Sequence, residues 1–201
     1  MIIGLRDYTV KPEARRRFVE RCENVLFPAQ ERLGAMIMGM FTDADFDDRV
    51  VWLRAMPDLA SRERILTEFY TNGEMWKAQK DEVNDWIINS SNVLMTHIAS
   101  EWAGPSLGGS VVSMYSNVRR GAAGTTAPDP NVTASIQSAG GRQLIALEVD
   151  AAPNNYPRHP IRTGECGHVW FASFDPRRYR SLGLSGIAER RLLPTATSRM
   201  R

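Results

Sequence analysis

The sequence contains few of the residues that mark specialised classes of protein. It has two cysteines, Cys22 and Cys166, and neither belongs to a Cys-x-x-Cys pair, which argues against a disulfide-dense scaffold and a zinc ribbon. No stretch approaches about 18 uninterrupted apolar residues, so we expect no membrane-spanning helix and no membrane partner. The N-terminus turns polar at Arg6 without the apolar run of a secretory signal. We therefore expect a cytoplasmic protein.

Lysine is also scarce, because Lys11, Lys77 and Lys80 are the only lysines among 25 basic residues. The net charge of +2 is too small to predict a nucleic-acid partner. The charge is unevenly spread, since residues 142–201 carry ten arginines and five acidic residues. Such a basic tail fits either an anionic ligand or a solvated surface, and charge patterning alone favours the surface.

The common nucleotide, nucleophile and metal motifs are absent. No Gly-x-Gly-x-x-Gly follows a predicted strand, and no Gly-Lys-Ser/Thr loop is present. The segment 183–186 (Gly-Leu-Ser-Gly) lacks the spacing of a nucleophile elbow. Cys166 and His168 have only His159 nearby as a further soft ligand, too few for a zinc site. We predict neither a metal nor a cofactor.

The first 100 residues instead predict an ordered series of strands and helices. One helix begins at Pro12, carries an apolar stripe at helical spacing and ends at Gly34; another begins after Pro57-Asp58. The predicted strands are 2–9, 35–42, 49–55 and 92–98. This β-α-β-β-α-β order is that of a ferredoxin-like plait, an antiparallel sheet with both helices on one face.

The strand at 35–42 is apolar on both faces. Strict alternation places Ile37, Gly39 and Phe41 on one side, and Met36, Met38 and Met40 on the other. Leaving such a surface in water costs about 25 cal/mol per Å². We therefore expect a second sheet to cover the face that the helices leave bare.

The second half of the chain contains candidates for that sheet. A β-like run at 111–115 and a strand at 142–149 flank a loop expected at 121–141, with at most one helical turn. Val169-Trp170 running into Asp175-Pro176 repeats the pattern of Val51-Trp52 running into Pro57-Asp58, with a period of about 118 residues. We predict a ferredoxin-like half at 1–103 and a degenerate second half at 104–201, with an eroded first helix, a Gly/Pro-rich loop and a basic C-terminal tail.

Three segments of the first half resemble the NIPSNAP family: GLRDYTVKP (4–12), GMFT (39–42) and RVVWLRAMPDLASRERI (49–65). The segment RLLPTATSR (191–199) is similar to the tails of such proteins, whereas Asp-Phe-Asp-Asp at 45–48 departs from the Gly-Pro-Leu-Asn turn that relatives often have. The resemblance implies an α+β fold of the dimeric α/β-barrel class. In that class two plaits pack sheet against sheet, between chains or within one, so we expect a homodimer or higher homo-oligomer.

Strand alternation predicts a group of polar side chains in an aromatic wall. Arg6 and Tyr8 share one face of the first strand, Trp52 and Arg54 share a face of the third, and His97 points from the fourth. If these faces coincide, they line a small-molecule pocket. His97 would then move a proton, Arg6 or Arg54 would hold a carboxylate or enolate, and Tyr8 would donate a hydrogen bond.

We expect Trp52, Met38, Tyr70 and Trp76 to contact the substrate. Core packing is the alternative for Trp52, and it is the favoured interpretation for Tyr70 and Trp76. The polar residues also have structural alternatives, because Arg6 and Arg54 can pair with Asp7, Glu63 or acidic residues of a partner chain, and His97 can be an interface histidine. One sequence does not fix the strand orientation that decides between these interpretations.

Fold resemblance does not choose an activity. The wider class includes cofactor-free monooxygenases, isomerases, dehydratases and haem enzymes. We therefore predict a cofactor-independent enzyme of oxygenase, isomerase or lyase type that acts on a small organic molecule. The alternative is a non-catalytic small-molecule-binding or protein-interaction module. In a haem-binding alternative, His97, His159 or His168 would be the axial ligand.

Overall fold

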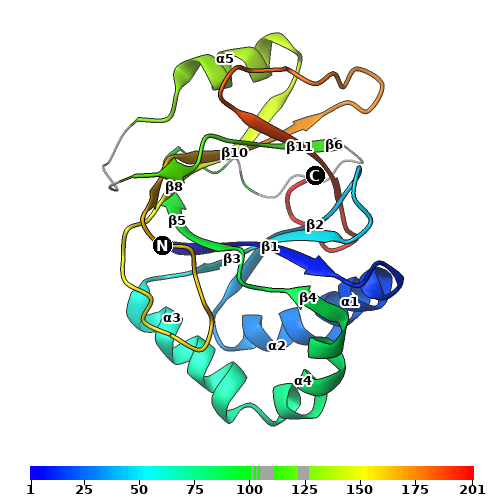
Figure 1. The fold of residues 1–201 in the computed structure, drawn as a ribbon, viewed down its shortest axis with the longest axis vertical. Coiled ribbons are helices and arrows are strands. Elements are labelled where there is room, and N and C mark those ends of the chain that lie inside the picture. Colours follow the sequence, from blue (N-terminus) through cyan, green and yellow to red (C-terminus); the bar gives the residue numbers. More distant parts are fainter. Residues whose placement is uncertain (101, 103, 105–110, 122–126) are drawn as a thin grey trace.

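The computed structural model describes residues 1–100, 102, 104, 111–121 and 127–201. The main strands are β1 (Ile2–Val10), β2 (Met36–Asp43), β3 (Arg49–Met56), β5 (Val93–Ile98), β6 (Val111–Ser116), β8 (Arg142–Val149), β10 (His168–Phe174) and β11 (Ala188–Pro194). They form a closed antiparallel barrel in the order β3-β2-β11-β6-β10-β8-β5-β1, with β1 pairing back to β3 (Figure 1). The fold is therefore mixed α+β around an 8-stranded barrel.

Each half of the chain contributes four neighbouring strands to the barrel. The first half supplies β5-β1-β3-β2 and the second supplies β8-β10-β6-β11. When each set is written from its last strand in the chain, both have the same fourth-first-third-second order, since the second set then reads β11-β6-β10-β8. Trp52 of β3 and Trp170 of β10 lie on strands with the same place in their sets.

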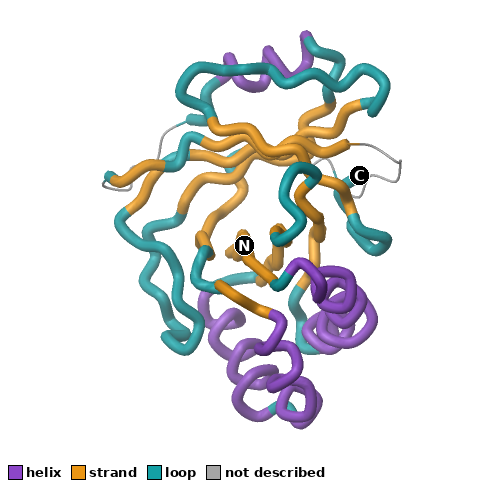
Figure 2. The backbone as a smooth tube through the Cα atoms, turned by 45° about the vertical axis from the view of Figure 1, so that its right-hand side comes forward, coloured by secondary structure: helices purple, strands orange, loops and turns teal. Residues whose placement is uncertain are grey.

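Helices cover the outer face of the first four strands (Figures 1 and 2). The first helical region contains a 3₁₀ turn (Pro12–Ala14), α1 (Arg15–Arg21), a π-helical segment (Cys22–Leu26) and α2 (Phe27–Arg32). The second contains α3 (Leu59–Leu66), a π-helical segment (Thr67–Asn72) and α4 (Glu74–Trp86). Three short strands, β4 (Ile87–Asn89), β7 (Arg119–Arg120) and β9 (Glu165–Cys166), and the helix α5 (Pro130–Ser138) complete the described elements. None of the described helices combines the length and apolarity needed to cross a membrane.

The helix of the second half contradicts the expected erosion. The segment expected to hold at most one helical turn contains α5 (Pro130–Ser138), whose first turn is capped by the Asp129 side chain accepting from the backbone N–H of Asn131 at 2.9 Å. Conversely, residues 175–187, where the repeat predicts a helix after Pro176, contain no helix. The second half therefore keeps the first crossover helix and lacks the second.

The barrel interior is a core built from both halves. The expectation that a second sheet covers the bare face of the first is confirmed. Leu5, Leu53 and Leu94 of the first half pack with Leu147 and Phe171 of the second, all of them buried. Burial of this shared surface is the main stabilisation that holds the halves together.

A β-bulge in β2 overturns the expected alternation of its methionines. The pairing register with β3 shifts between Ile37 and Gly39, so the strand gains one residue there. Met38 therefore points into the barrel core, whereas Met40 packs on the opposite, helix-covered side. Strict period-two counting fails past a bulge because the extra residue exchanges the two faces.

The C-terminal segment is part of the barrel instead of a free basic tail. β11 pairs with β2 and β6 and so closes the barrel within one chain. Leu192 and Met200 are completely buried, and Arg191 pairs with Asp45 at 2.7 Å. The sequence did not predict β11 as a strand, because only one face of the strand packs against the core and the other face is polar and rich in arginine.

Candidate functional site

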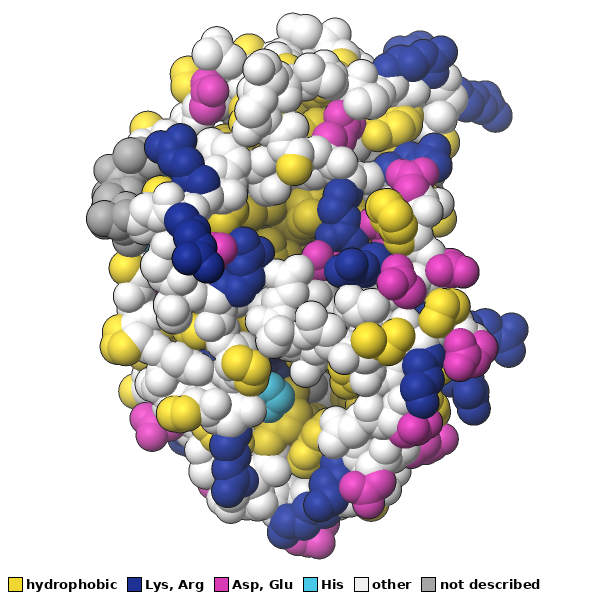
Figure 3. All heavy atoms as spheres, viewed as in Figure 1, with side chains coloured by type: hydrophobic (Ala, Val, Ile, Leu, Met, Phe, Trp, Pro, Cys, Tyr) yellow, Lys and Arg dark blue, Asp and Glu magenta, His cyan; other side chains and the backbone are white. Residues whose placement is uncertain are grey.

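Two pockets lie on opposite faces of β1. The helix-side pocket, of about 70 Å³, is bounded by Tyr8, Trp52, Tyr70, Trp76 and His159 among other residues. The barrel-mouth pocket, of about 200 Å³, opens at one end of the barrel. Figure 3 shows one apolar hollow between the two halves and a second among the helices below, with a histidine at its rim.

The β1–β3 register brings the predicted arginines together against Trp52, one of the residues that line the helix-side pocket. Arg6 lies directly opposite Trp52, and Gly4 lies opposite Arg54. The two guanidinium carbons lie 4.9 Å (Arg6) and 5.4 Å (Arg54) from the centroid of the Trp52 ring. Both guanidinium groups therefore make cation–π contacts with the same indole ring. These contacts lower the free-energy cost of removing the two charges from water.

A third arginine belongs to this group. Arg62 of α3 is 4% exposed, against 2% for Arg6 and 1% for Arg54. Its guanidinium donates to the side-chain oxygens of Asn155 and Asn154, the latter at 3.2 Å. Burial, with the charge of Arg6, lowers the pKa of Arg54 to about 10 and that of Arg62 to about 10. The lowered pKa values show that the surroundings of Arg54 and Arg62 disfavour the positively charged form of each side chain.

Within the described part of the chain, none of these three guanidiniums pairs with a carboxylate. Arg6 donates to the Tyr8 hydroxyl at 3.5 Å, and Arg54 donates to Gln30 and to the Tyr70 hydroxyl at 3.5 Å. The Nε atom of Arg6, and Nε and Nη2 of Arg54, are buried without a hydrogen-bond partner there. Among the described residues, Arg6 and Arg54 therefore do not form the ion pairs with Asp7 or Glu63 that were the structural alternative for them.

Aromatic side chains form the walls around the cations. Tyr8 meets Trp52 edge to face at 6.0 Å, and Tyr70 meets Trp76 at 4.9 Å in the same geometry. Burial raises the pKa of the Tyr8 hydroxyl, although Arg6 and Arg54 oppose the shift. Tyr8 therefore stays a neutral hydroxyl that can donate to a ligand oxygen.

The histidine at the pocket is His159. Its ring lies 4.1 Å from that of Tyr70, centroid to centroid, and it comes from the segment 150–164 between β8 and β9. Burial and the charges of Arg6, Arg54 and Arg62 lower its pKa to about 2. The ring is therefore a neutral acceptor and donor at physiological pH.

His97 lies elsewhere, at the seam between the two halves. It stands opposite Glu148 in the β5–β8 register, with Nε2 at 3.1 Å from Glu148 and Nδ1 at 3.4 Å from Asp150. Val93, which shares the His97 face of β5, packs on the helix side. The position of His97 along the strand, however, separates it from the pairing partners of Arg6.

Met38 also lies outside the group, because the bulge in β2 turns it into the barrel core. Trp52, Tyr70 and Trp76 line the helix-side pocket. Arg62 is not among the residues predicted for the site, although an arginine inside the apolar stripe of Leu59, Ile65 and Leu66 is a visible signal. An isolated cation on the buried face of a helix needs a partner or a ligand.

Both π-helical segments border this pocket. Cys22 and Leu26 line it from the first segment, and Tyr70 from the second. The first ends with the Phe27 N–H donating to Cys22, one residue before Pro28, which has no N–H to donate. Such wide turns concentrate at functional sites because they re-aim side chains that a regular α-helix would place elsewhere.

The comparison with protein families identifies the first half. The NIPSNAP family model matches residues 3–100. Residues 3–100 form a NIPSNAP domain. The pocket-lining Tyr8, Trp52 and Tyr70 belong to this NIPSNAP domain, as do the three adjacent arginines, whereas His159 comes from the second half. No curated protein matches the chain.

Solved structures match nearly the whole chain, NIPSNAP domain and second half together. A candidate monooxygenase from Lactobacillus acidophilus is 11% identical, with 96% of this chain and 93% of that one covered and a TM-score of 0.54. A candidate monooxygenase from Fusobacterium nucleatum is 11% identical, with 96% and 91% covered and a TM-score of 0.56. An anthrone oxidase-like protein is 9% identical, with 96% and 91% covered and a TM-score of 0.53. Identities this low show a shared fold alone.

Proposed function

We propose that the chain is a cofactor-independent enzyme of oxygenase, isomerase or lyase type, acting on a small organic anion in the helix-side pocket. The observation that carries the proposal is the burial of Arg6, Arg54 and Arg62 without a carboxylate partner among the described residues. A buried unpaired charge is costly, so a site that keeps three of them is built to receive negative charge. An anionic ligand supplies that charge.

The shared first step of these reaction types is removal of a proton from carbon or a phenol. The C–H or O–H bond breaks, the electron pair passes to the substrate oxygen, and the guanidiniums of Arg6 and Arg54 stabilise the resulting enolate or phenolate. We assign the proton to His159. As the proton leaves, negative charge develops on the substrate between His159 and the arginines. This charge raises the pKa of the imidazole from about 2, so His159 becomes a stronger base during the proton transfer.

The volume of the helix-side pocket limits the size of the substrate. Its volume of about 70 Å³ is less than half that of a 150 Å³ cavity that binds benzene, so a ring enters only after the walls move. Tyr70 and Trp76 are half-buried and come from the π-helical segment and the turn after it, which makes them the side chains to move. The names of the structural neighbours, two candidate monooxygenases and an anthrone oxidase-like protein, support the oxygenase type within this range.

We further propose that each half is a ferredoxin-like plait and that the chain is a fused pair of them. The common fourth-first-third-second strand order supports this relation. Assembly into a homodimer or higher homo-oligomer and a cytoplasmic location stay predictions. The barrel closes within one chain, so an oligomer would use another surface.

Anion binding tests the pocket directly. We expect benzoate to raise the thermal unfolding midpoint of the wild type and to have no effect on Arg54→Met, while benzyl alcohol has little effect on either. The unliganded Arg54→Met variant should unfold at the same temperature or higher, because it removes an unpaired buried charge. Arg178→Met makes the same charge change on an exposed residue and should keep the benzoate response. An equal benzoate response in wild type and Arg54→Met would refute the site.

Catalysis is tested by proton exchange with phenylpyruvate, an aromatic acid with an enolisable carbon. We expect the wild type to accelerate exchange of its benzylic protons in D₂O, followed by NMR, and His159→Gln to lose at least about tenfold of that acceleration while still binding benzoate. Benzoate binding with exchange no faster than in buffer would instead support the non-catalytic binding module.

A further inference from the structure

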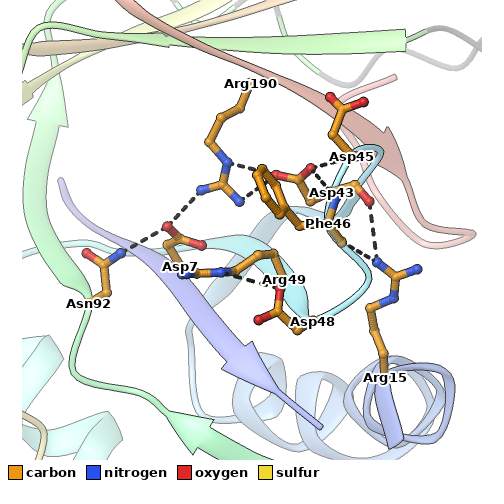
Figure 4. A network of polar contacts seen from close by, with 9 residues as sticks. All are labelled: Asp7, Arg15, Asp43, Asp45, Phe46, Asp48, Arg49, Asn92 and Arg190. Atoms are coloured by element: carbon orange, nitrogen blue, oxygen red, sulfur yellow. Dashed lines mark hydrogen bonds and ion pairs between the residues drawn. The ribbon is translucent and has the colours of Figure 1, made fainter. Parts of the chain in front are cut away.

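A polar connection along one side of the barrel-mouth pocket joins the two halves without reaching the helix-side pocket. Arg190 of β11 lies 2.7 Å from the carboxylates of both Asp7 and Asp43 (Figure 4). Arg15 donates to the carbonyl oxygens of Asp43 at 3.3 Å and Phe46 at 2.8 Å. These contacts hold β11 of the second half against β1 and β2 of the first, which is a structural role.

A second connection between the halves ends at the proposed catalytic site. The segment 150–164 leaves the barrel after β8, reaches the helices of the first half and returns to the barrel at β9 (Figure 1). Tyr156 fixes the segment to α3, because it is 6% exposed and packs with Ile65 and Leu66. His159 follows three residues later. The segment therefore carries the proposed base from the second half to a pocket of the first.

Asn154 joins this segment to Arg62 and to His159 at the same time. Its Oδ1 atom accepts from Nη2 of Arg62 at 3.2 Å and from the backbone N–H of Tyr156 at 3.1 Å. Its Nδ2 atom donates to the carbonyl oxygen of His159 at 2.8 Å. The backbone N–H of His159 donates to the Tyr156 carbonyl oxygen at 3.1 Å, which closes a turn over 156–159. One amide therefore holds both ends of this turn and ties them to a side chain of α3.

An amide suits position 154 because it is a donor and an acceptor at once. The guanidinium of Arg62 needs an acceptor and the His159 carbonyl oxygen needs a donor; a carboxylate would serve only the first of these groups. Arg62 is 4% exposed, so it is a fixed, charged donor instead of a mobile surface side chain. Precise placement matters for a base, since a displacement of about 1 Å costs a rate of reaction about a hundredfold.

We propose that Asn154 is the positioning residue of the candidate site, and that it holds His159 in the helix-side pocket by tying its main chain to Arg62. This inference rests on the proposed function, in which His159 takes the substrate proton. Arg62 then has a second role beside its charge, because it fixes a segment that the second half contributes. The site is complete only when both halves have folded against each other.

The test compares the same substitution at two neighbouring residues. Asn154→Asp keeps an acceptor for Arg62 and loses the donor to His159. Asn155 also accepts from Arg62, but it donates to the carbonyl oxygen of Leu59, so Asn155→Asp is the matched control. Both variants place one new carboxylate beside the same arginine, and they differ in whether the contact with His159 is lost.

The ring signals of His159 report the result without any substrate. The rings of Tyr70 and Tyr156 lie 4.1 Å and 5.6 Å from that of His159, centroid to centroid, and their ring currents displace its NMR signals. With ¹³C-labelled histidine, we expect most of this displacement to be lost in Asn154→Asp and to be retained in Asn155→Asp. Equal displacement in the two variants would overturn the proposal. If Asn154→Asp does not fold, Asn154→Ala is compared with Asn155→Ala by the same signals.

Kinetics give a second readout. We expect Asn154→Asp to exchange the protons of phenylpyruvate with a kcat at least about tenfold below that of Asn155→Asp, and with a KM within about twofold, because only the base is displaced. Equal kcat values would also refute the positioning role. The NMR comparison needs neither benzoate nor turnover. Failure of the proposed function would therefore appear as absent exchange in a protein whose His159 signals still depend on Asn154.

Discussion

At the scale of single residues, the distinctive feature is three arginines in a protein interior with no acid beside them in the described chain. Most buried arginines are paired, because an isolated guanidinium loses its hydration without compensation. Here Trp52, Tyr8, Gln30 and Tyr70 provide a partial substitute through ring faces and neutral oxygens. Partial compensation leaves the group receptive to an anion.

His159 gives this environment a pH signature. Its pKa of about 2 in the folded protein lies below the ordinary value of about 6.5 expected when the chain is unfolded. Between these values the unfolded chain binds a proton that the folded protein does not. The free energy of unfolding therefore decreases as the pH falls below about 6.5, by up to about 1.4 kcal/mol per pH unit.

We expect His159→Gln to lose this dependence. Urea unfolding at pH 7 and pH 5 should show the wild type losing up to about 2 kcal/mol more than the variant over this range. Acidic residues titrate in both proteins, so their contribution cancels when the pH-dependent loss of unfolding free energy in the variant is subtracted from that in the wild type. The remaining difference is the contribution of His159. Parallel profiles for the two proteins would place His159 in a solvated environment and contradict its assignment to the pocket.

At the scale of elements, the helix-side pocket depends on turns that depart from α-helical geometry. The π-helical segment Thr67–Asn72 carries Tyr70 and ends at Gly73. A Cβ atom at Gly73 would stand 2.4 Å from the Phe69 carbonyl oxygen, a backbone atom that cannot move without the helix. Glycine is therefore required here by close approach.

Gly73→Ala should disturb this turn. We expect a lower free energy of unfolding, by about 1–3 kcal/mol, and a weaker benzoate response, because Tyr70 and Trp76 flank the altered residue. Gly4→Ala adds a Cβ at an ordinary 3.7 Å from its nearest neighbour and should cost less. Urea unfolding followed by tryptophan fluorescence measures both variants. Equal effects of the two substitutions would show that the turn tolerates a side chain.

The sequence predicted the elements of the first half well and those of the second half less well. The strand at 142–149 was predicted at its observed bounds, whereas β11 and α5 were missed as elements. β11 contains Glu189, Arg190 and Arg191, whose charges obscure a period-two pattern. Such a strand is stabilised by its neighbours β2 and β6, and its own composition carries little of the signal.

At the scale of the whole molecule, the two halves need each other. Residues 1–103 alone would expose the face that carries Leu5, Leu53 and Leu94, which the second half buries in the intact chain. A contiguous apolar surface of this kind drives association. The strand edges at β2 and β5, which pair with β11 and β8, would also be open.

We therefore expect the isolated segment 1–103 to self-associate, with two copies replacing the missing half by packing sheet against sheet. Size-exclusion chromatography with light scattering should give a dimer or larger species. The full chain, measured in parallel, shows whether any association persists after the barrel is complete. A monomeric, cooperatively unfolding segment at tens of micromolar would contradict the shared core.

The sequence by itself determined which side chains share a face within one strand, such as Arg6 with Tyr8 and Trp52 with Arg54, because alternation is a local property of each strand. The β1–β3 register of the folded chain brings these two pairs together. Only the tertiary structure decided which histidine joins them, which methionine turns inward and what closes the barrel. The segment with His159 reaches the arginines through contacts such as Arg62 to Asn155, 93 residues apart. Such contacts exist only after both halves have folded against each other, and no local pattern encodes them.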